Sequence, residues 1–365
     1  MTGGDGDVGY AANSKIQGKA IVMSRPLLRS AVEQAHAWLS SRPGTMVVAD
    51  LGCSSGPNTL AVVSMVLDAL AGRCQQPPVH VQFFLNDLHG NDFNLVFRSL
   101  ELFDQVVGKD KGDAPLPPYY IAGLPGSFYT RLFPDRCVHL FHSSYCLMIR
   151  SKVPEELASG AILNEGNVYI WEATPPSVVK AYQEQFRQDF SLFLELRHAE
   201  LVAGGQMVVT FLGRKNKDVL RGEMSYLWGL LSKSLQSLVQ QGRVEKEKME
   251  SFNLPLYAPS VDEVEAVIES GGLFDVDHVE LFETNWDPED DDTDSDVVLD
   301  GAQSGVNVAK GMRAVLAPLL THHFGDGILD DLFQMYARNV AKHLEKVKTK
   351  YAVILLSLKA RRAEN

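Results

Sequence analysis

Short apolar runs of strand length alternate along this chain with longer segments in which apolar residues recur at helical spacing. The runs at residues 46–51, 79–85, 137–142 and 206–212 each predict a strand, and the amphipathic stretch 177–201 predicts a long helix. Strands that alternate with helices of this length are typical of βαβ units and a mostly parallel sheet. The pattern therefore predicts an α/β fold.

Weaker signals extend the pattern towards both ends of the chain. Residues 1–20 are largely polar and predict a flexible arm, and the glycine pair at 204–205 predicts a turn. Further helices are expected at residues 26–40 and 326–346, and further strands at residues 167–170, 274–282 and 351–359.

Two mainly helical segments, 215–268 and 305–345, break the alternation and predict a helical layer over one end of the sheet. The acidic run 287–296 between them lacks the glycine and the final glutamate of a calcium-binding loop, so it predicts a solvated surface loop. We expect a sheet core and a helical cap, the core from residues 1–212, 270–300 and 346–365 and the cap from residues 213–269 and 301–345.

The composition narrows the functions that this fold could serve. With 365 residues, 45% of them hydrophobic, the chain can bury a large core, and its net charge of −12 argues against a nucleic-acid or anionic-membrane partner. No apolar run approaches the ~20 residues of a membrane span, and no signal-peptide pattern opens the chain. The cysteines are scattered, without a C-x-x-C pair, and predict reduced thiols (Cys53, Cys74, Cys137, Cys146). We expect a cytoplasmic protein.

Polar residues stand where the first two predicted strands end. Asp50, Gly52 and Asn58 lie at or beyond the end of the first strand, and Asp87 and Leu88 follow the second. Open parallel sheets bind ligands in the crevice beyond the carboxyl ends of their strands. A glycine turn there lets a ligand approach the backbone, and an acid on the second strand can accept hydrogen bonds from ribose hydroxyls. These residues predict a nucleoside site.

The spacing of these residues narrows the kind of nucleoside. Residues 52–57 read GCSSGP, which is neither the dinucleotide motif G-x-G-x-x-G nor a phosphate-binding P-loop. Asp87 lies 31 residues after Gly56 (87 − 56), whereas a nicotinamide-dependent dehydrogenase has its acid roughly 20 residues on. The pattern favours a ligand with ribose but no pyrophosphate, and it disfavours a dehydrogenase.

Several long and unusual stretches resemble the plant SABATH family of methyltransferases and follow the family's order over nearly the whole chain. They are YAANSKIQ (10–17), ADLGCSSGPN (49–58), LNDL (85–88), GNDFN (90–94), GLPGSFY (123–129), HSSY (142–145), FNLPLY (252–257), NVAKGMRA (307–314) and KTKY (348–351). The resemblance implies a Rossmann-like class I methyltransferase sheet that binds S-adenosylmethionine. It further implies that the helical cap forms the acceptor pocket and that the protein is a homodimer.

The resemblance also implies which residues contact the cofactor. Asp87 matches the residue that accepts hydrogen bonds from the ribose, and Ser127 and Phe128 match residues that flank the adenine. The full set of matching cofactor positions is Tyr10, Ser14, Asp50, Gly52, Cys53, Asn58, Asp87, Leu88, Ser127, Phe128 and Tyr145.

For the acceptor, Gln17 matches the residue whose side-chain amide holds the substrate carboxylate. Met148 and Met312 are expected to sandwich a flat ring through sulfur–aromatic contacts. The positions that match the pocket lining are Tyr145, Met148, Ile149, Leu212, Leu227, Trp228, Tyr257, Met312, Val315 and Tyr351. The expected reaction is methyl esterification of a small aromatic acid of the benzoate, salicylate or anthranilate kind. The alternatives are a longer acid such as jasmonate or indole-3-acetate, an N-methylating member, or a non-catalytic binder.

Two positions depart from the family pattern. Relatives that methylate carboxylates commonly have Trp where this chain has Ile149, so a carboxylate donor is missing unless Arg150 or another group replaces it or the acceptor sits differently. Some relatives are assigned magnesium at matching positions, but here Glu250 stands where Asp is usual. We expect at most a weak structural cation at the matching residues Asn164, Glu250, Phe252 and Asn253.

The expected chemistry needs no general base. A carboxylate with a pKa near ~4 is ionised at neutral pH, and the sulfonium methyl group is electrophilic. The protein has to exclude water and align the reacting oxygen and carbon about 3–3.5 Å apart. Gln17 and Tyr145 are expected to position the acceptor, and His142 is interpreted as a packed histidine with a fixed hydrogen bond rather than a base.

Overall fold

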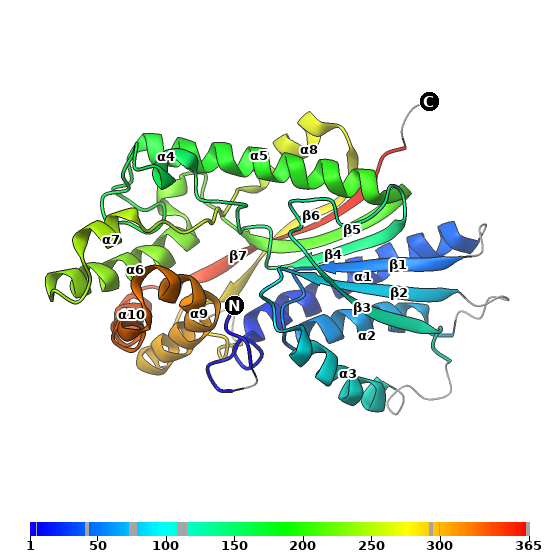
Figure 1. The fold of residues 1–365 in the computed structure, drawn as a ribbon, viewed down its shortest axis with the longest axis horizontal. Helices are drawn as coiled ribbons and strands as arrows, with labels where there is room; N and C mark the ends of the chain where they lie inside the picture. Colours follow the sequence, from blue (N-terminus) through cyan, green and yellow to red (C-terminus); the bar gives the residue numbers. More distant parts are fainter. Residues whose placement is uncertain are drawn as a thin grey trace.

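A seven-stranded sheet forms the centre of the computed structural model, which describes residues 1–4, 6–40, 44–72, 79–107, 115–291, 295–298 and 300–362 (Figure 1). The strand order is β3-β2-β1-β4-β5-β7-β6. Neighbouring strands from β3 to β5 are parallel, and β7 runs antiparallel between β5 and β6. The strands are Thr45–Leu51 (β1), His80–Asp87 (β2), Tyr119–Pro125 (β3), Val138–Ser144 (β4), Leu201–Gly213 (β5), Phe274–Asn285 (β6) and Lys350–Ala360 (β7). The carboxyl ends of β1 to β4 therefore meet at one edge of the sheet.

Helices cover both faces of the sheet (Figure 1). On one face, α1 packs against α2 and against β4 and β5, and α3 adjoins α2. On the other face, α5 lies against α8, which in turn contacts β6. These helices are Lys15–Ser40 (α1), Asn58–Leu70 (α2), Phe93–Val107 (α3), Pro176–Glu200 (α5) and Val261–Gly271 (α8), with the single-turn α4 at Glu155–Ala158. The predicted α/β class is confirmed.

A second group of helices extends beyond one end of the sheet and forms the helical cap. In this group α10 packs against α9 and α6, and α7 adjoins α6. The helices are Glu223–Gln240 (α6), Lys246–Ser251 (α7), Gly301–Phe324 (α9) and Leu329–Leu344 (α10), with 3-10 turns at Val219–Arg221 and Asp326–Ile328. Helix α8 falls within the expected cap residues 213–269 and 301–345, but it packs on the sheet side instead.

The two faces of the sheet belong to two apolar cores because successive strand residues point to opposite sides. Val48 and its neighbour Leu140 pack with α1 and α2. Ala49 and its neighbour Phe141 belong to a larger core that continues through α5 into Leu332 and Tyr336 of the cap helix α10. Sheet and cap are therefore joined by continuous apolar packing.

Most of the predicted elements are confirmed. The runs at 46–51, 79–85, 137–142 and 206–212 lie in or overlap β1, β2, β4 and β5, and the long helix agrees with α5 to within one residue at each end. The runs at 274–282 and 351–359 belong to β6 and β7, and the helix near 326–346 is α10 with its 3-10 turn. The helix expected at 26–40 is the second part of α1, which contains Pro26. Strand β3 was not predicted.

Two predicted elements are wrong. Residues 167–170 are buried but form no strand, because the Val168 N–H donates to Ser232 Oγ (3.0 Å) and its carbonyl accepts from the Leu254 N–H (2.8 Å). The predicted turn at 204–205 lies inside β5, where Gly204 has a φ of +78° and the pairing with β4 shifts register. In both places the backbone finds partners that local sequence does not reveal.

The described part of the amino-terminal arm packs against the rest of the molecule. The Thr2 N–H donates to the Ala314 carbonyl of α9 (2.8 Å), and the Tyr10 N–H donates to the Thr2 carbonyl (3.0 Å). Tyr10 and Ser14 are buried. The expectation of a flexible arm is therefore wrong for these residues.

The acidic run is not a solvated loop along its first half. Asp287 is buried and accepts hydrogen bonds from Ser304 Oγ (2.6 Å) and Asn307 Nδ2 (3.0 Å) of α9. Asp290 forms an ion pair with Lys348 at 2.7 Å. The expectation is wrong for Asp287 and Asp290, whereas Glu289 and Asp291 are exposed as expected, and residues 292–294 lie outside the described part of the chain.

Candidate active site

The turn after β1 brings backbone close to the carboxyl ends of its neighbours. Gly52 has a φ of +77°, and a Cβ added there would lie 2.1 Å from Cys146 Sγ, so only glycine fits. The Gly52 and Cys53 N–H groups both donate to the Asn86 carbonyl of β2 (2.8 and 2.9 Å). The turn is therefore fixed against the neighbouring strand, and Gly52 and Cys53 line a small hollow beside it.

Asp87 ends β2 and is held by backbone donors on both oxygens. Its Oδ2 accepts from the Ser54 N–H and its Oδ1 from the Leu88 N–H, each at 2.7 Å. Burial raises the pKa of Asp87 above its usual range, although these two hydrogen bonds act in the opposite direction. Leu88 beside it is 59% exposed. The carboxylate is fixed in orientation at the strand end where a ribose acceptor is expected.

Asp50, on β1, forms a buried polar cluster with two side chains. Its Oδ1 lies 2.7 Å from His142 Nδ1 of the adjacent strand β4, and its Oδ2 accepts from Thr59 Oγ1 of α2 at 2.6 Å. His142 is 1% exposed. The interpretation of His142 as a packed histidine with a fixed hydrogen bond is confirmed.

The expected cofactor residues gather around this edge of the sheet. Asn58 at the start of α2 donates from Nδ2 to the Ser14 carbonyl (3.0 Å), which ties the arm to the turn. A small hollow there is lined by five of the expected residues, Tyr10, Asp50, Gly52, Cys53 and Asn58. Asp87, Leu88, Ser127 and Phe128 lie at the ends of β2 and β3.

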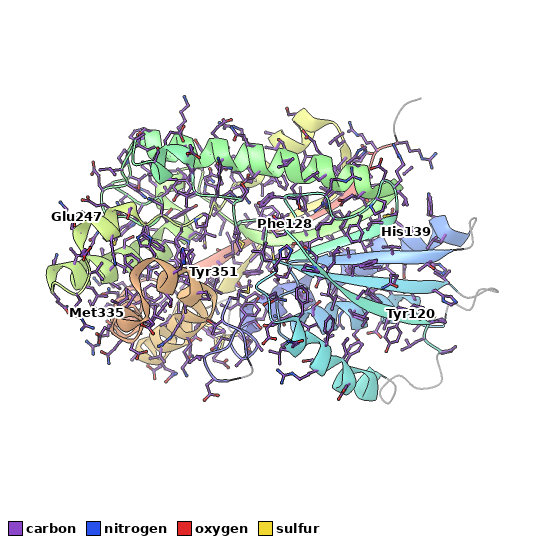
Figure 2. The ribbon with its side chains drawn as sticks, viewed as in Figure 1. Tyr120, Phe128, His139, Glu247, Met335 and Tyr351 are labelled. Atoms are coloured by element: carbon purple, nitrogen blue, oxygen red, sulfur yellow. The ribbon has the colours of Figure 1, made fainter. Side chains whose placement is uncertain are left out.

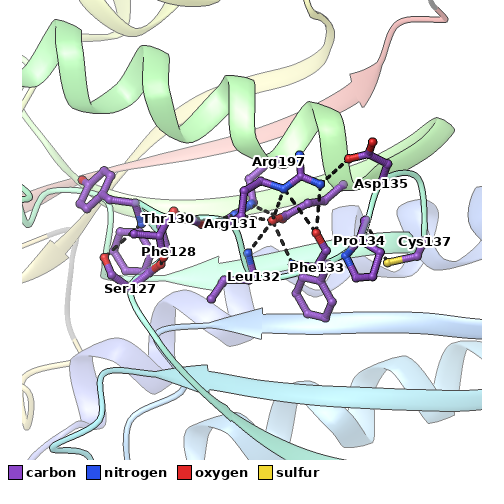
Figure 3. A network of polar contacts seen from close by, with 12 residues as sticks. Ser127, Phe128, Thr130, Arg131, Leu132, Phe133, Pro134, Asp135, Cys137 and Arg197 are labelled. Carbon is purple, nitrogen blue, oxygen red and sulfur yellow. Dashed lines mark hydrogen bonds and ion pairs between the residues drawn. The ribbon is translucent and has the colours of Figure 1, made fainter.

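A buried ion pair fixes the loop that follows β3 and carries Ser127 and Phe128 (Figure 3). Arg197 of α5 donates to the carbonyls of Phe128 and Thr130, both at 2.9 Å, and its Nε lies 2.8 Å from Glu200 Oε2. Both charged residues are fully buried. Glu200 Oε1 in turn accepts from the N–H groups of Leu132 (2.7 Å) and Phe133 (3.1 Å). This pair was not predicted from the sequence.

Phe128 is positioned by its neighbours as well as by its backbone. Its ring packs edge-on against Phe193 of α5, with centroids 6.0 Å apart. Figure 2 shows Phe128 and Tyr351 towards the middle of the molecule, where the sheet and the cap meet. An aromatic face is therefore held near the Gly52 turn.

An apolar cavity of about 150 Å³ adjoins the carboxyl ends of the strands (the strand edge) and is lined by residues of the arm, the sheet, its loops and the cap. Expected acceptor residues that line it are Gln17, Tyr145, Met148, Ile149, Leu212, Trp228, Met312, Val315 and Tyr351. The sequence analysis missed the lining residues Met1, Tyr10, Ile16, Met224, Leu254, Pro255, Leu256, Leu316 and Leu319. Five of the missed residues lie inside the quoted stretches 10–17 and 252–257, which were the available signal.

Two expected acceptor residues do not line this cavity. Leu227 is fully buried within the cap, and its carbonyl lies 3.4 Å from the Tyr336 hydroxyl. Tyr257 donates its hydroxyl proton to Glu263 Oε1 (2.8 Å) and packs against Phe186 of α5. Both side chains support the surrounding structure instead.

Polar groups without partners border the apolar cavity. Gln17 Oε1, Trp228 Nε1 and the Tyr351 hydroxyl are buried, and none has a hydrogen-bond partner among the described residues. Burial raises the pKa values of Tyr145 and Tyr351, so both hydroxyls stay protonated at neutral pH. Buried polar groups of this kind, here one amide acceptor and two donors, are normally paired, so they indicate that a polar ligand completes the site.

Arg150 does not replace the missing tryptophan donor. Ile149 lines the cavity, but Arg150 does not. The Arg150 guanidinium is buried over the rings of Tyr129 and Phe186 and donates to the Leu147 carbonyl. The option that Arg150 holds the substrate carboxylate is therefore wrong.

The residues expected for magnesium do not fit a hard-cation site. Glu250 is paired with Lys246 at 3.4 Å. Asn164 has both side-chain atoms engaged, because Nδ2 donates to the Tyr169 carbonyl and Oδ1 accepts from Thr174 Oγ1. Phe252 and Asn253 are buried. Within the described residues no three His, Cys, Asp or Glu side chains are grouped to hold a metal ion.

Two further sequence expectations can be placed in the structure. Cys53, Cys137 and Cys146 are free thiols, and Cys74 lies outside the described residues. None of the helices that the structure describes is both long and apolar enough to cross a membrane.

Comparison with known proteins gives full-length matches. A family model described as SAM dependent carboxyl methyltransferase matches residues 1–361. The chain is 52% identical to anthranilate O-methyltransferase 2 of Zea mays, over 98% of this chain and 96% of that protein. It is also 52% identical to benzoate O-methyltransferase of Zea mays, over 98% of this chain and 97% of that protein. Among solved structures, loganic acid methyltransferase with SAH is similar, with a TM-score of 0.83, 32% identity and coverage of 100% and 99%.

Proposed function

This chain belongs to the SAM-dependent carboxyl methyltransferase family, and we therefore propose that it methylates the carboxylate of a small aromatic acid of the benzoate, salicylate or anthranilate type. The observation that carries this choice of acceptor is the apolar cavity beside the strand edge. Its volume of about 150 Å³ equals that of engineered apolar cavities that bind benzene. Met148 and Met312 line it and can contact a flat ring through their sulfur atoms.

The cofactor fits the polar strand edge in this proposal. Asp87 would accept hydrogen bonds from the ribose, Phe128 would pack on the adenine, and the Gly52 turn would leave room for the methionine part. When bound there, S-adenosylmethionine supplies an electrophilic methyl group on a positively charged sulfur. The residues of the chain therefore have to bind, orient and dehydrate the acceptor, and none has to remove a proton.

The acceptor carboxylate would be oriented by donors at the border of the cavity. The Gln17 amide can donate to one oxygen. Because Ile149 has no donor, the second oxygen would turn to Trp228 Nε1 or to the Tyr351 hydroxyl, which lack partners among the described residues. The apolar walls exclude water, which strengthens the attraction between a carboxylate and a sulfonium.

A methyl-transfer assay with radiolabelled S-adenosylmethionine across a panel of acids tests this proposal. We expect benzoate, salicylate or anthranilate to give the highest kcat/KM, and jasmonate and indole-3-acetate to be poorer because they exceed the cavity. A preference for the longer acids would overturn the acceptor assignment. Cofactor binding without transfer to any acid would favour the non-catalytic alternative.

We also propose that the protein acts in the cytoplasm as a homodimer. Support comes from the family resemblance. Sedimentation equilibrium of the purified chain and imaging of a fluorescent fusion test the two statements. We assign no part in the reaction to magnesium, because Glu250 and Asn164 are engaged elsewhere.

A further inference from the structure

The loop after β3 (residues 126–130, the cofactor loop) is a compact unit on the cofactor side of the site. The Tyr129 N–H donates to Ser127 Oγ (3.2 Å), and the rings of Phe128 and Tyr129 lie in contact, with centroids 4.8 Å apart. Figure 3 shows Arg197 beside this loop, where it donates to the Phe128 carbonyl at 2.9 Å. Phe128 and Tyr129 therefore belong to one unit, and a shift of one ring displaces the other.

The apolar cavity proposed for the acid (the acceptor cavity) has one side made of two backbone segments. Met148, Ile149, Pro255 and Leu256 line the cavity here and form the acceptor wall. Ile149 and Leu256 pair as an antiparallel bridge, and the Arg150 N–H donates to the Pro255 carbonyl at 2.7 Å. The acceptor wall is therefore a second unit, held together by its own backbone.

The side chain of Tyr129 joins the cofactor loop to the acceptor wall. Its hydroxyl donates to the Ile149 carbonyl at 2.7 Å. Burial raises the pKa of Tyr129, so the hydroxyl stays protonated at neutral pH and can donate. The Arg150 guanidinium lies 6.0 Å from the centre of the Tyr129 ring and adds a second contact between the two units. Tyr129 lines neither the acceptor cavity nor the small hollow at Gly52.

We propose that Tyr129 is a positioning residue whose hydrogen bond to Ile149 sets the acceptor wall against the cofactor loop and so couples the two substrates. In the proposed reaction a carboxylate oxygen bonds to the methyl carbon as the carbon–sulfur bond breaks, so the reacting atoms have to be held in line about 3–3.5 Å apart. A ligand that orders one unit also orders the other through Tyr129. The second ligand then loses less conformational entropy when it binds. The inference rests on the proposed function and adds a residue outside both binding sites.

Calorimetric titration of benzoate with and without saturating S-adenosylhomocysteine tests the coupling. The sulfur of this ligand is uncharged, so the coupling it produces does not come from attraction between sulfonium and carboxylate. In the wild-type chain it should raise the affinity for benzoate about fivefold or more, as is typical of coupled sites. Tyr129→Phe keeps the ring beside Phe128 and Arg150 but lacks the hydroxyl. It should reduce this gain to about twofold or less and leave the affinity for S-adenosylhomocysteine alone within about twofold of wild type.

Single-turnover kinetics test the alignment separately. With S-adenosylmethionine and benzoate both saturating, Tyr129→Phe should transfer the methyl group about tenfold more slowly than wild type, because a misplaced acceptor slows the chemical step itself. If Tyr129 only supported the wall, its loss would raise the KM for benzoate and leave the rate at saturation unchanged. That result would overturn the inference.

Tyr182→Phe is the matched control. Tyr182 of α5 donates its hydroxyl to the Leu254 carbonyl (3.0 Å), and Leu254 lines the same cavity. This variant also removes a tyrosine hydroxyl from a backbone carbonyl beside the acid, but the link from the cofactor loop stays intact. It should weaken benzoate binding by the same factor with and without S-adenosylhomocysteine.

The outcomes separate the inference from the function beneath it. Wild-type coupling retained in Tyr129→Phe, or lost equally in Tyr182→Phe, would overturn the role of Tyr129. Benzoate affinity that does not respond to S-adenosylhomocysteine in the wild-type chain would overturn it as well. Each of these results leaves the proposed function standing. If the wild-type chain bound S-adenosylhomocysteine but no benzoate, salicylate or anthranilate, the proposed acceptor would fail together with the inference.

Discussion

The carboxyl ends of the strands (the strand edge) and the acceptor cavity lie side by side, but different interactions stabilise them. At the edge, charged and polar groups are fixed by short hydrogen bonds, as with Asp87 between two N–H groups and Arg197 against Glu200. In the cavity, apolar side chains from the arm, the sheet and the cap pack together, and Trp228 Nε1 and the Tyr351 hydroxyl stay unpaired among the described residues. Hydrogen-bond geometry fixes the groups at the strand edge, whereas the volume of the cavity determines which acid fits. A change at the edge should therefore affect every reaction, and a change in the cavity should alter the choice of acid.

The largest expected effect comes from breaking the buried pair behind the edge. Arg197→Met removes the nearer charge partner of the buried Glu200 and leaves only Arg131, at 3.6 Å. Removing one partner of a buried pair typically lowers the free energy of unfolding by about 3–5 kcal/mol. Chemical denaturation measures this loss. The double variant Arg197→Met with Glu200→Gln should recover part of it, because no charge is left buried alone. A double variant as unstable as the single one would mean that packing, not charge, dominates here.

Asp87→Ala should reduce affinity for S-adenosylhomocysteine tenfold or more, because a hydrogen bond to a charged group contributes about 1.5–3 kcal/mol. Calorimetric titration measures the affinity. Asp275→Ala, an exposed strand residue paired with Arg361, is the matched control and should bind normally. Unchanged affinity in Asp87→Ala would remove Asp87 from the cofactor site.

The raised pKa of Asp87 predicts how the stability of the protein depends on pH. Burial raises the pKa of Asp87 above 3.8, so the folded chain binds this proton more tightly than the unfolded chain. The resulting stabilisation is present below pH 3.8 and is lost as the pH rises through the raised value. Without cofactor, Asp87→Asn should therefore gain stability relative to wild type from pH 4 to pH 7. Thermal unfolding at the two pH values measures the difference, and a constant difference would contradict the prediction.

In the cavity, Gln17→Ala should raise the KM for the acid, since an under-satisfied charged group costs about 1–3 kcal/mol. Ile149→Trp restores an indole donor and should lower that KM several-fold, unless the added volume overpacks the site at a similar cost. Steady-state kinetics of both variants and their combination decide between these results. Gln17→Ala should damage the Ile149→Trp background less than the wild type. Equal damage would mean that residue 149 does not face the carboxylate.

The smallest effects are expected from substitutions of two aspartates in the acidic run, one buried and one exposed. Asp287→Ala strands the donors of Ser304 and Asn307 and should lower the free energy of unfolding by about 1–3 kcal/mol. Asp291→Ala removes only an exposed pair with Lys19, which is worth about 0–1 kcal/mol. Chemical denaturation of both variants measures the contrast. Equal losses would restore the interpretation of the run as one solvated loop.

The sequence was most informative at the strand edge. Apolar runs that end in Asp50 and Asp87 locate the carboxyl ends of β1 and β2, because strand length and burial follow from local composition. Arg197 and Glu200 gave no such signal. Charged residues three apart on a helix usually form an exposed pair, and only the folded loop after β3 buries this one.

The cavity was less predictable because motif positions do not give side-chain directions. Leu227 and Trp228 are adjacent in α6, but consecutive helical residues point about 100° apart. Trp228 therefore faces the cavity while Leu227 faces the cap interior. The arm residues Tyr10 and Ile16 were missed as lining residues because their contacts depend on the sheet and α9 folding around them.

The position of β7 has a consequence for the synthesis of the protein. This strand lies between β5 and β6, yet its residues are translated after all the other strands of the described sheet. Until residues 350–360 leave the ribosome, β5 and β6 each present an edge that can pair with another chain. Unpaired edges and long-range pairings make a nascent chain slow to fold and prone to aggregate. The nascent chain is therefore expected to need protection by chaperones until the last strand is inserted.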